Sequence, residues 1–258
     1  MTKTLNGDKK IVKVRNLEFG GDRPIIIAGP CSVESKEQLY ETVKGLKEIG
    51  VDCIRGGIFK PRTSPFDFQG LGIEGLKYLR EVSEEFDLPI VTELMDDKYL
   101  DIFIEFVDII QVGSRNMYNY SLLKELGKTN KPILLKRGMS ATIKEWVMAA
   151  EYIASNGNDN IILCERGIRS FDNYTRNLMD ISAVPIMKME TGLPVIIDPS
   201  HGTGNKELIL PMTKAGLAAG ADGVIIEVHY KPETALCDGE QSLDLEQYKK
   251  FYNEIRSS

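Results

Sequence analysis

The sequence has few of the features that mark membrane, zinc-finger or nucleic-acid-binding proteins. No apolar run approaches the roughly 18 residues of a membrane span, and the start, MTKTLNGDKK, has no apolar signal-peptide core. The four cysteines are far apart and form no CxxC pair, which argues against zinc fingers and dithiol redox motifs. A net charge of −6 argues against general affinity for nucleic acids or membrane surfaces. We therefore expect a cytoplasmic protein with reduced thiols.

What the sequence does contain is a regular alternation of short apolar runs and longer helical stretches, which occurs eight times after Pro24. Apolar strands followed by helices indicate a parallel sheet covered on both faces. Eight units in about 230 residues predict an α/β fold of the (β/α)8 TIM-barrel type, with a doubly wound open sheet as the alternative. The predicted strands are residues 25–28, 53–59, 90–94, 109–112, 133–135, 161–164, 195–197 and 224–228.

The segment before the first predicted barrel strand reads differently. Residues 11–22 hold two short apolar pieces around Arg15-Asn16, which predicts a small hairpin. Because no linker or shift in composition marks a second domain, we expect one catalytic (β/α)8 domain over residues 23–258. Residues 1–22 are expected to form an N-terminal extension that covers the bottom of the barrel.

The ends of the predicted strands carry the unusual residues. In (β/α)8 enzymes the active site lies at the carboxyl ends of the strands and in the loops that follow. Here seven of the eight ends carry an ionisable side chain, and the first carries the thiol of Cys31. After the second strand, Arg55, Lys60 and Arg62 fall within eight residues, beside glycines that let the backbone approach a ligand. We therefore expect an anion-binding site on this rim.

Two subsets separate by chemistry. The cations suit phosphate and carboxylate groups. They are Arg55, Lys60, Arg62, Arg115, Lys136 and Arg166. A mixed sulfur, nitrogen and oxygen set suits a divalent transition metal, with zinc, iron, cobalt and manganese all open. Its members are Cys31, His201, Glu227 and Asp238. Simpler roles exist for each: a buried cysteine often packs as a small hydrophobe, and the carboxylates could pair with the arginines.

Several motifs together resemble one enzyme family. They are GPCSVES, RGGIFKPRTSPFDFQGLG, VGSRN, LLKRG, ILCERG, IDPSHGTG, IIEVH and ALCDGEQSL. The chain resembles the 3-deoxy-D-arabino-heptulosonate-7-phosphate (DAHP) synthases over roughly residues 11–255, and is most similar to their short type I-beta form. The resemblance implies a transferase barrel that joins phosphoenolpyruvate to erythrose 4-phosphate and water, and releases phosphate. That reaction is the first step of the shikimate pathway of aromatic amino acid biosynthesis.

The resemblance also implies roles for the residues. It implies one divalent metal, with Mn²⁺ expected and Fe²⁺, Co²⁺ or Zn²⁺ as alternatives. Its ligands would be Cys31, His201, Glu227 and Asp238. The phosphate of phosphoenolpyruvate would meet Arg115, Lys136, Arg166 and the backbone of Gly113 and Ser114. Its carboxylate would meet Arg55, Lys60 and Lys136.

At the other end of the site, the resemblance implies that Arg62 and Thr63 hold the tetrose phosphate. Lys60 and Glu93 are the catalytic candidates. We expect cationic neighbours to lower the pKa of Lys60, which would suit it for proton transfer at the aldehyde. Glu93 would act as a partner of the attacking water or of Lys60. The role of His229, two residues after Glu227, stays open.

Two other functions compete with this interpretation. An octulosonate-8-phosphate synthase would use a five-carbon sugar phosphate, but the Lys-Pro-Arg-Thr sequence at residues 60–63 favours the four-carbon substrate. A non-catalytic phosphosugar-binding barrel would be expected to have lost part of one subset. We further expect a homo-oligomer, dimer or tetramer, and a separate chorismate mutase as a candidate partner. About 22 residues before the first strand are too few for an amino-acid-binding domain, so we expect no feedback inhibition of this chain alone.

Overall fold

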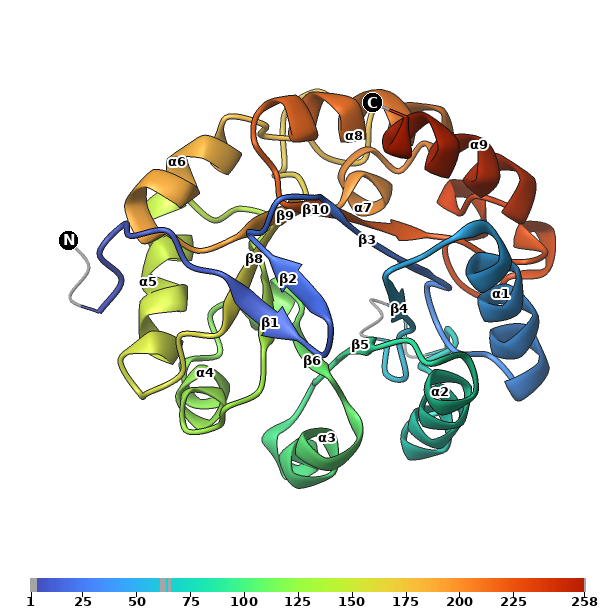
Figure 1. The fold of residues 1–258 in the computed structure, drawn as a ribbon, viewed down its shortest axis with the longest axis horizontal. Helices are drawn as coiled ribbons and strands as arrows, with labels where there is room; N and C mark the ends of the chain where they lie inside the picture. The colour runs from blue at the N-terminus through green and yellow to red at the C-terminus, as the bar shows by residue number, and fades with distance from the viewer. Residues whose placement is uncertain (1–3, 61–63, 65, 258) are drawn as a thin grey trace.

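The computed structural model describes residues 4–60, 64 and 66–257, and it shows a closed barrel of parallel strands surrounded by helices (Figure 1). The strands follow one another around the barrel in the order β10-β3-β4-β5-β6-β7-β8-β9. Their bounds are β3 Ile25–Gly29, β4 Cys53–Arg55, β5 Ile90–Glu93, β6 Ile109–Val112, β7 Ile133–Lys136, β8 Ile161–Glu165, β9 Val195–Ile197 and β10 Gly223–Glu227. The predicted (β/α)8 fold is confirmed.

The strands are apolar throughout because both of their faces are buried. Along β3, Ile25 and Ile27 join the cluster inside the barrel, whereas Ile26 and Ala28 join the cluster beneath the helices. This alternation is the two-residue period of a strand. A continuous apolar run therefore encodes a strand with a packed core on each side, which is why the periodicity predicted the barrel.

The longer helices cover the outside of the barrel, and the short α7 follows β9 at the rim. Their bounds are α1 Lys36–Ile49, α2 Ile73–Phe86, α3 Leu100–Phe106, α4 Tyr120–Gly127, α5 Ile143–Ala154, α6 Ala183–Thr191, α7 Pro199–Thr203, α8 Ile209–Ala218 and α9 Leu245–Arg256. Side-chain caps start several of them: Thr142 forms a capping box with Glu145 on α5, and Asp244 forms one with Gln247 on α9. Among the described residues, no helix combines the length and apolar character needed to cross a membrane.

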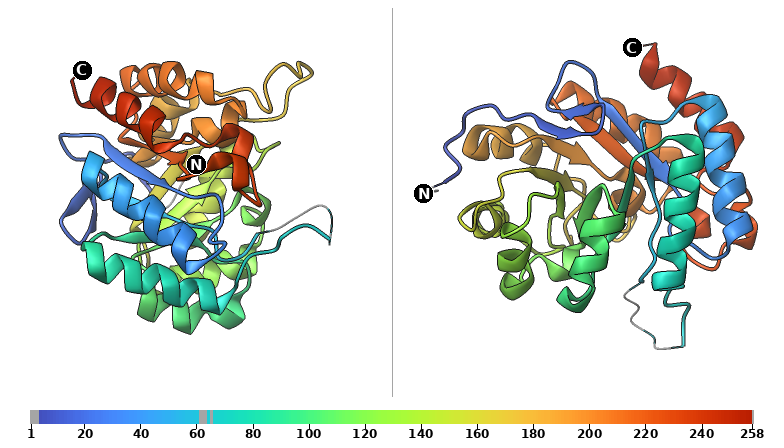
Figure 2. Two further views of the ribbon diagram at one scale, coloured as in Figure 1. Left: turned by 90° about the vertical axis from the view of Figure 1, so that its right-hand side faces the viewer. Right: turned by 60° about the horizontal axis from the view of Figure 1, so that its bottom comes forward.

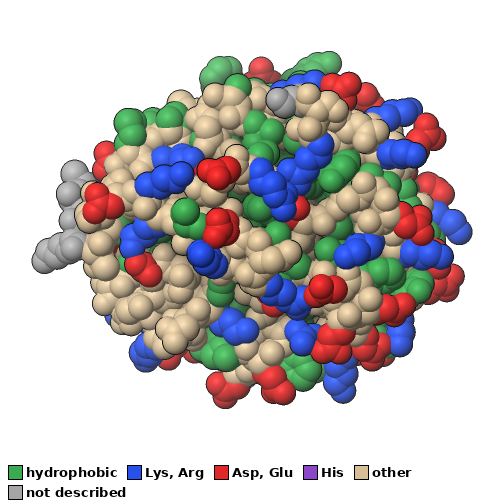
Figure 3. Space-filling view, in the orientation of Figure 1, with side chains coloured by type: hydrophobic (Ala, Val, Ile, Leu, Met, Phe, Trp, Pro, Cys, Tyr) green, Lys and Arg blue, Asp and Glu red, His purple; other side chains and the backbone are tan. Residues whose placement is uncertain are grey.

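An antiparallel hairpin precedes the barrel, as predicted. Strands β1 (Val12–Val14) and β2 (Leu17–Phe19) pair with Val14 opposite Leu17, and Arg15 in the turn has a φ of 50°. The apolar side chains of both strands belong to the same buried cluster as the inward residues of the barrel. In the left view of Figure 2 the hairpin lies on the side opposite the segment that follows β8. On the face that Figure 3 shows, cationic and anionic side chains are interspersed.

The second barrel strand is shorter than the apolar run predicted. The sequence indicates a strand over residues 53–59, but β4 ends at Arg55. After Arg55 the chain turns toward the preceding loop, where Gly57 forms an isolated parallel bridge with Ser32. Gly57 N donates to Cys31 O at 3.2 Å, and Val33 N donates to Gly57 O at 2.9 Å. Arg55 therefore ends the strand, and Lys60 lies in the loop beyond it.

Candidate active site

A cavity of about 240 Å³ opens at the carboxyl ends of the barrel strands. Its described lining holds six cations and three carboxylates, so its charge favours anionic ligands. The residues that line it are Arg55, Lys60, Asp67, Glu93, Gln111, Gly113, Ser114, Arg115, Lys136, Met139, Arg166, Arg176, His201 and Asp238. Ten of these were predicted from the sequence, and Cys31 lines a smaller adjoining cavity.

Barrel closure gathers the two predicted subsets on separate arcs of the rim. Strands β9, β10 and β3 are neighbours. The metal-type donors at their ends are His201, Glu227 and Cys31. Strands β6, β7 and β8 are also neighbours. The cations at their ends are Arg115, Lys136 and Arg166. The site therefore has a donor side and a cationic side, between which β4 and β5 contribute Arg55 and Glu93.

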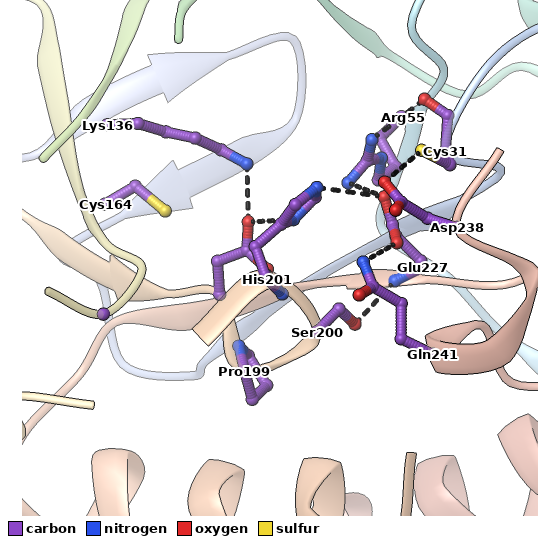
Figure 4. A network of polar contacts seen from close by, with 12 residues as sticks. Cys31, Arg55, Lys136, Cys164, Pro199, Ser200, His201, Glu227, Asp238 and Gln241 are labelled. Carbon is purple, nitrogen blue, oxygen red and sulfur yellow. Dashed lines mark hydrogen bonds and ion pairs between the residues drawn. The ribbon is translucent and has the colours of Figure 1, made fainter. Parts of the chain in front are cut away.

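Asp198 orients His201, whose imidazole lies between Lys136 and Glu227 in Figure 4. As the N-cap of α7, Asp198 accepts the backbone N–H of His201 at Oδ1 (3.0 Å). Its Oδ2 lies 2.8 Å from His201 Nδ1 and accepts a bond from Lys136 Nζ at 2.5 Å. Burial alone would raise the pKa of Asp198, but His201 and Lys136 hold it well below its usual range. A carboxylate at Nδ1 leaves Nε2 as the atom that can bind a metal.

Glu227 faces that nitrogen from the end of β10. Its Oε2 accepts a bond from Gln241 Nε2 at 2.6 Å. Its Oε1 is buried and accepts no hydrogen bond within the described part of the chain, although His201 Nε2 lies 3.1 Å away and Arg55 Nη1 3.4 Å away. Burial would raise the pKa of Glu227, yet His201 and Arg55 lower it well below its usual range. A buried carboxylate oxygen opposite an imidazole nitrogen is a fitting position for a cation.

The donor atoms form two groups that share Asp238. The donors of His201, Glu227 and Asp238 lie within 4.8 Å of one another, and so do those of Cys31, Cys237 and Asp238. Cys31 Sγ lies 3.1 Å from Asp238 Oδ2. A mixed set of imidazole, carboxylate and thiol donors fits a divalent transition metal. The four predicted ligands are thus divided between two groups that Asp238 joins, and Cys237 is an additional thiol that the sequence did not predict.

The cations of the cavity are only partly paired within the protein. Among the described residues, Arg55 Nη1 and Arg166 Nη1 are buried and make no hydrogen bond. Burial lowers the pKa of Arg166 from its ordinary value. A buried donor without a partner costs about 1–3 kcal/mol, which an anionic ligand would recover. Lys136 is buried and reaches the cavity beside them, while Arg115 is exposed at its edge.

The pKa of Lys60 shifts in the direction opposite to the one expected from the sequence. We expected cationic neighbours to lower its pKa. Burial does act in that direction, but Cys31 and Glu227 raise the pKa of Lys60 above its ordinary value. Its Nζ lies 2.9 Å from Cys31 Sγ and 3.9 Å from Asp238 Oδ2. The expected direction was wrong because barrel closure places thiol and carboxylate groups, rather than other cations, next to the ammonium group.

Glu93 packs against the backbone that begins the β6 loop. Its Oε2 accepts a bond from Gln111 Nε2 at 3.1 Å. A side chain at Gly113 would place its Cβ 2.0 Å from Glu93 Oε1, so only glycine leaves room for the carboxylate there. Glu93 is thereby held at the edge of the cavity, next to Ser114.

The sequence did not predict every residue of the cavity, and two predicted residues lie outside the described part of the chain. Arg62 and Thr63, predicted for the tetrose phosphate, lie outside the described residues. The cavity residues absent from the prediction are Asp67, Gln111, Met139 and Arg176. Arg176 Nη1 donates to Gln241 Oε1 at 3.0 Å and lies 3.6 Å from Asp238 Oδ1. No strand end marks Arg176, because it lies on the long segment between β8 and α6.

His229, whose role the sequence left open, belongs to neither donor group. Its Nδ1 accepts the backbone N–H of Lys231 at 3.0 Å, and its Nε2 faces Glu34 Oε2 at 3.8 Å. Glu34 Oε1 also accepts the backbone N–H of Leu236 at 2.9 Å. His229 and Glu34 thus contact the segment that carries Asp238 without contributing a donor to the groups above.

Known proteins resemble this chain over nearly its whole length. A profile described as the DAHP synthetase I family matches residues 8–257. The phospho-2-dehydro-3-deoxyheptonate aldolase of Thermotoga maritima is 48% identical over 99% of this chain and 76% of its own length. A crystal structure of that enzyme, with the same coverage of both chains, superposes with a TM-score of 0.95.

Two further matches are a second structure of the T. maritima enzyme and a more distant relative of another enzyme type. A truncated form of the T. maritima DAHP synthase is 46% identical, with a TM-score of 0.90, and the match covers 97% of this chain and 92% of that one. The 2-dehydro-3-deoxyphosphooctonate aldolase of Syntrophotalea carbinolica is 34% identical over 95% of this chain and 94% of its own. The fold, the two arcs of the rim and these matches agree, and the chain belongs to the DAHP synthetase I family.

Proposed function

We propose that the protein condenses phosphoenolpyruvate with erythrose 4-phosphate and water, and releases DAHP and inorganic phosphate. One observation carries the proposal: the cavity lined by the cations at the ends of β6, β7 and β8 is also lined by two metal-type donors, His201 after β9 and Asp238 after β10. Two anionic substrates repel each other, so a cavity rich in cations is required before they can bind together.

Phosphoenolpyruvate binds on the cationic side. Its phosphate meets Arg115, Lys136 and Arg166, with the Gly113–Ser114 backbone beside them. Arg166 is the strongest support, because its Nη1 is buried and makes no hydrogen bond among the described residues. Arg55 has the same property at Nη1 and, with Lys60, is placed to hold the carboxylate. A buried guanidinium nitrogen without a hydrogen-bond partner can gain a charge-assisted hydrogen bond when the anionic substrate binds.

The donor side holds one divalent metal, and Mn²⁺ is the ion we propose. Its ligands are Cys31, His201, Glu227 and Asp238, supported by the two groups of neighbouring donor atoms that share Asp238. When bound, such an ion supplies a Lewis acid next to the aldehyde of the tetrose. Asp198 keeps Nδ1 of His201 engaged, so that Nε2 faces the ion. Gln241 holds the other oxygen of Glu227.

We assign proton transfer to Lys60 and Glu93, which both line the cavity. Carbon 3 of phosphoenolpyruvate attacks the aldehyde carbon, and the aldehyde oxygen takes a proton. Lys60 is the proposed donor of that proton, and its Nζ lies next to the donor side, 2.9 Å from Cys31 Sγ. Glu93, fixed by Gln111, is placed to accept a proton from the water that adds at carbon 2. The hemiketal phosphate then releases phosphate by cleavage of its C–O bond.

The tetrose phosphate is assigned to Arg62 and Thr63, which lie outside the described residues. The choice of a four-carbon aldose rests on the Lys-Pro-Arg-Thr sequence and on the greater similarity to the heptonate enzyme of T. maritima than to the octonate enzyme of S. carbinolica. Higher activity with a five-carbon aldose phosphate would contradict this assignment.

The test is phosphate release by the purified protein with Mn²⁺ and phosphoenolpyruvate, with erythrose 4-phosphate, arabinose 5-phosphate or no aldose added. We expect release only with erythrose 4-phosphate. Faster release with arabinose 5-phosphate would assign the octulosonate reaction, and no release with any aldose would indicate a binding protein. Lys136→Met should abolish turnover. Lys188→Met is the matched control, because Lys188 pairs with Asp222 at 2.8 Å outside the cavity.

We also propose a domain organisation, an oligomeric state, a cellular location and a protein partner. We propose one catalytic unit over residues 23–258 with residues 1–22 covering the bottom of the barrel, supported by the burial of the β1–β2 side chains against the barrel interior. We also propose a cytoplasmic location. A homo-oligomer, dimer or tetramer, is supported by highly exposed large apolar side chains such as Phe171 and Tyr174. A separate chorismate mutase is the proposed protein partner. Light scattering and co-purification with an added chorismate mutase test these points.

A further inference from the structure

Cys237 is a second thiol beside the proposed metal ligand Cys31. The two residues are 206 positions apart, yet their Sγ atoms lie 3.1 Å apart, and both side chains are buried. Cys237 Sγ also lies 3.8 Å from Asp238 Oδ2, and Cys31 Sγ lies 3.1 Å from the same oxygen. Two sulfurs and one carboxylate oxygen thus form a triangle with edges of 3.1, 3.1 and 3.8 Å.

These distances are close to those between three ligands of one tetrahedral metal ion. With Zn–S and Zn–O bonds of about 2.3 and 2.1 Å, tetrahedral geometry gives about 3.8 Å between two sulfurs and about 3.6 Å between sulfur and oxygen. The observed distances differ from these values by about 0.7 Å at most, in the sulfur–sulfur pair. Small side-chain rotations would close that difference.

A packing role explains the position of Cys237 less well. Cys237 directly precedes the proposed ligand Asp238, whose φ of 51° is a conformation that a non-glycine residue rarely adopts. That backbone conformation is part of a turn that brings both side chains to Cys31. A small apolar residue could fill the space, but it would not add a donor to the group that Cys31, Cys237 and Asp238 form.

We propose that Cys237 is a further metal-binding residue, which lets the site hold a thiophilic divalent ion through Cys31, Cys237 and Asp238. The inference rests on the proposed function only in taking Cys31 and Asp238 as metal ligands. Each thiol loses its proton to solvent when its sulfur binds the ion. Thiolates favour soft ions such as Cd²⁺, Zn²⁺ and Co²⁺ over Mn²⁺. Cys237 would therefore determine which metal the site prefers.

The experiment counts thiolate ligands with Co²⁺ as the probe. The purified protein is kept reduced, stripped of metal and titrated with Co²⁺, and the near-ultraviolet sulfur-to-cobalt absorption is recorded. Because each Co–S bond contributes to this absorption, Cys237→Ser should lower it to about half of the wild-type value. Cys31→Ser should lower it similarly, and the double variant should abolish it. Cys53→Ser, which removes a buried thiol inside the barrel, is the matched control and should leave it unchanged.

A competition titration provides the second measurement. Against a chelator, Cys237→Ser should lose about ten- to a hundredfold in affinity for Cd²⁺ and much less for Mn²⁺. Equal cobalt spectra for wild type and Cys237→Ser, or equal losses for both ions, would overturn the proposal. A wild-type mass lower by two hydrogens under the assay conditions would overturn it too, because the pair would then be a disulfide.

These readouts are independent of turnover, so the two proposals can fail separately. A protein that releases no phosphate but binds Co²⁺ through two thiolates would refute the proposed function and keep this inference. If the protein catalyses the reaction with Mn²⁺ but Cys237→Ser leaves the cobalt spectrum unchanged, the proposed function stands and this inference is refuted. Circular dichroism of each variant confirms that it is folded before titration.

Discussion

Asp198→Asn should weaken metal binding and destabilise the protein at the same time. Asp198 is fully buried and contacts three partners: the backbone N–H of His201, His201 Nδ1 and Lys136 Nζ. The amide keeps the shape but loses the charge. It can also donate to Nδ1, which would place the remaining ring proton on Nε2 and turn that atom away from metal binding. The geometry of α7 would be preserved while the chemistry of His201 changes.

The magnitudes follow from the two contacts. Breaking one partner of a buried ion pair costs roughly 3–5 kcal/mol, because Lys136 is left buried without its counter-charge. Loss of a carboxylate that supports a metal-binding histidine typically costs about ten- to a hundredfold in metal affinity. We therefore expect urea unfolding of the metal-free variant to show the first loss. Competition with a chelator for Mn²⁺ should show the second.

The pH dependence has a definite sign. The folded-state pKa of Asp198 lies well below its usual range, despite the burial that opposes this, because His201 and Lys136 favour the carboxylate. Its contribution is therefore fully present above the unfolded pKa of about 3.9 and is lost as the pH falls through the folded pKa. The stability difference between wild type and Asp198→Asn should therefore shrink as the pH falls below about 4.

A matched variant separates the two effects. Asp222 also pairs with a lysine, Lys188, at 2.8 Å, and its Oδ2 accepts the backbone N–H of Val195 at 2.8 Å, at the other end of β9. Asp222→Asn should lower stability and leave Mn²⁺ affinity unchanged. If Asp198→Asn binds Mn²⁺ as tightly as wild type, the orientation of His201 by Asp198 does not matter for the metal, and the reasoning is refuted.

Four other predictions concern the remaining parts of the site. Exhaustive chelation should abolish turnover and Mn²⁺ should restore it, and full activity in a protein shown to be metal-free would contradict this. Arg166→Gln should raise the KM for phosphoenolpyruvate about ten- to a hundredfold without loss of unfolding free energy, because its Nη1 has no protein partner among the described residues; exposed Arg169→Gln is the control. Gly113→Ala should lower kcat by displacing Glu93, and an unchanged kcat would disprove that role. Arg62→Ala should raise the KM for erythrose 4-phosphate far more than that for phosphoenolpyruvate, and an equal rise would refute the assignment.

Local sequence determined the barrel and the residue types on its rim. Runs such as Ile25–Gly29 are apolar at every position because each strand packs on two cores, and this is visible without any partner strand. Once eight such units are recognised, the carboxyl ends of the strands must meet on one rim. Residues such as Lys136, Arg166 and Glu227 could therefore be assigned to a common site from their positions in the chain alone.

The tertiary structure decided what each rim residue contacts. Lys60 has a raised pKa because Cys31 and Glu227 surround it, and neither lies near it in the sequence. Arg176 and Cys237 reach the site from long segments between elements, where no strand end marks them. Strand periodicity specifies which face a side chain takes but not how far a loop extends across the rim. The contact between Cys31 and Cys237 arises only when barrel closure places β10 next to β3 and the turn at Asp238 directs its neighbour inward.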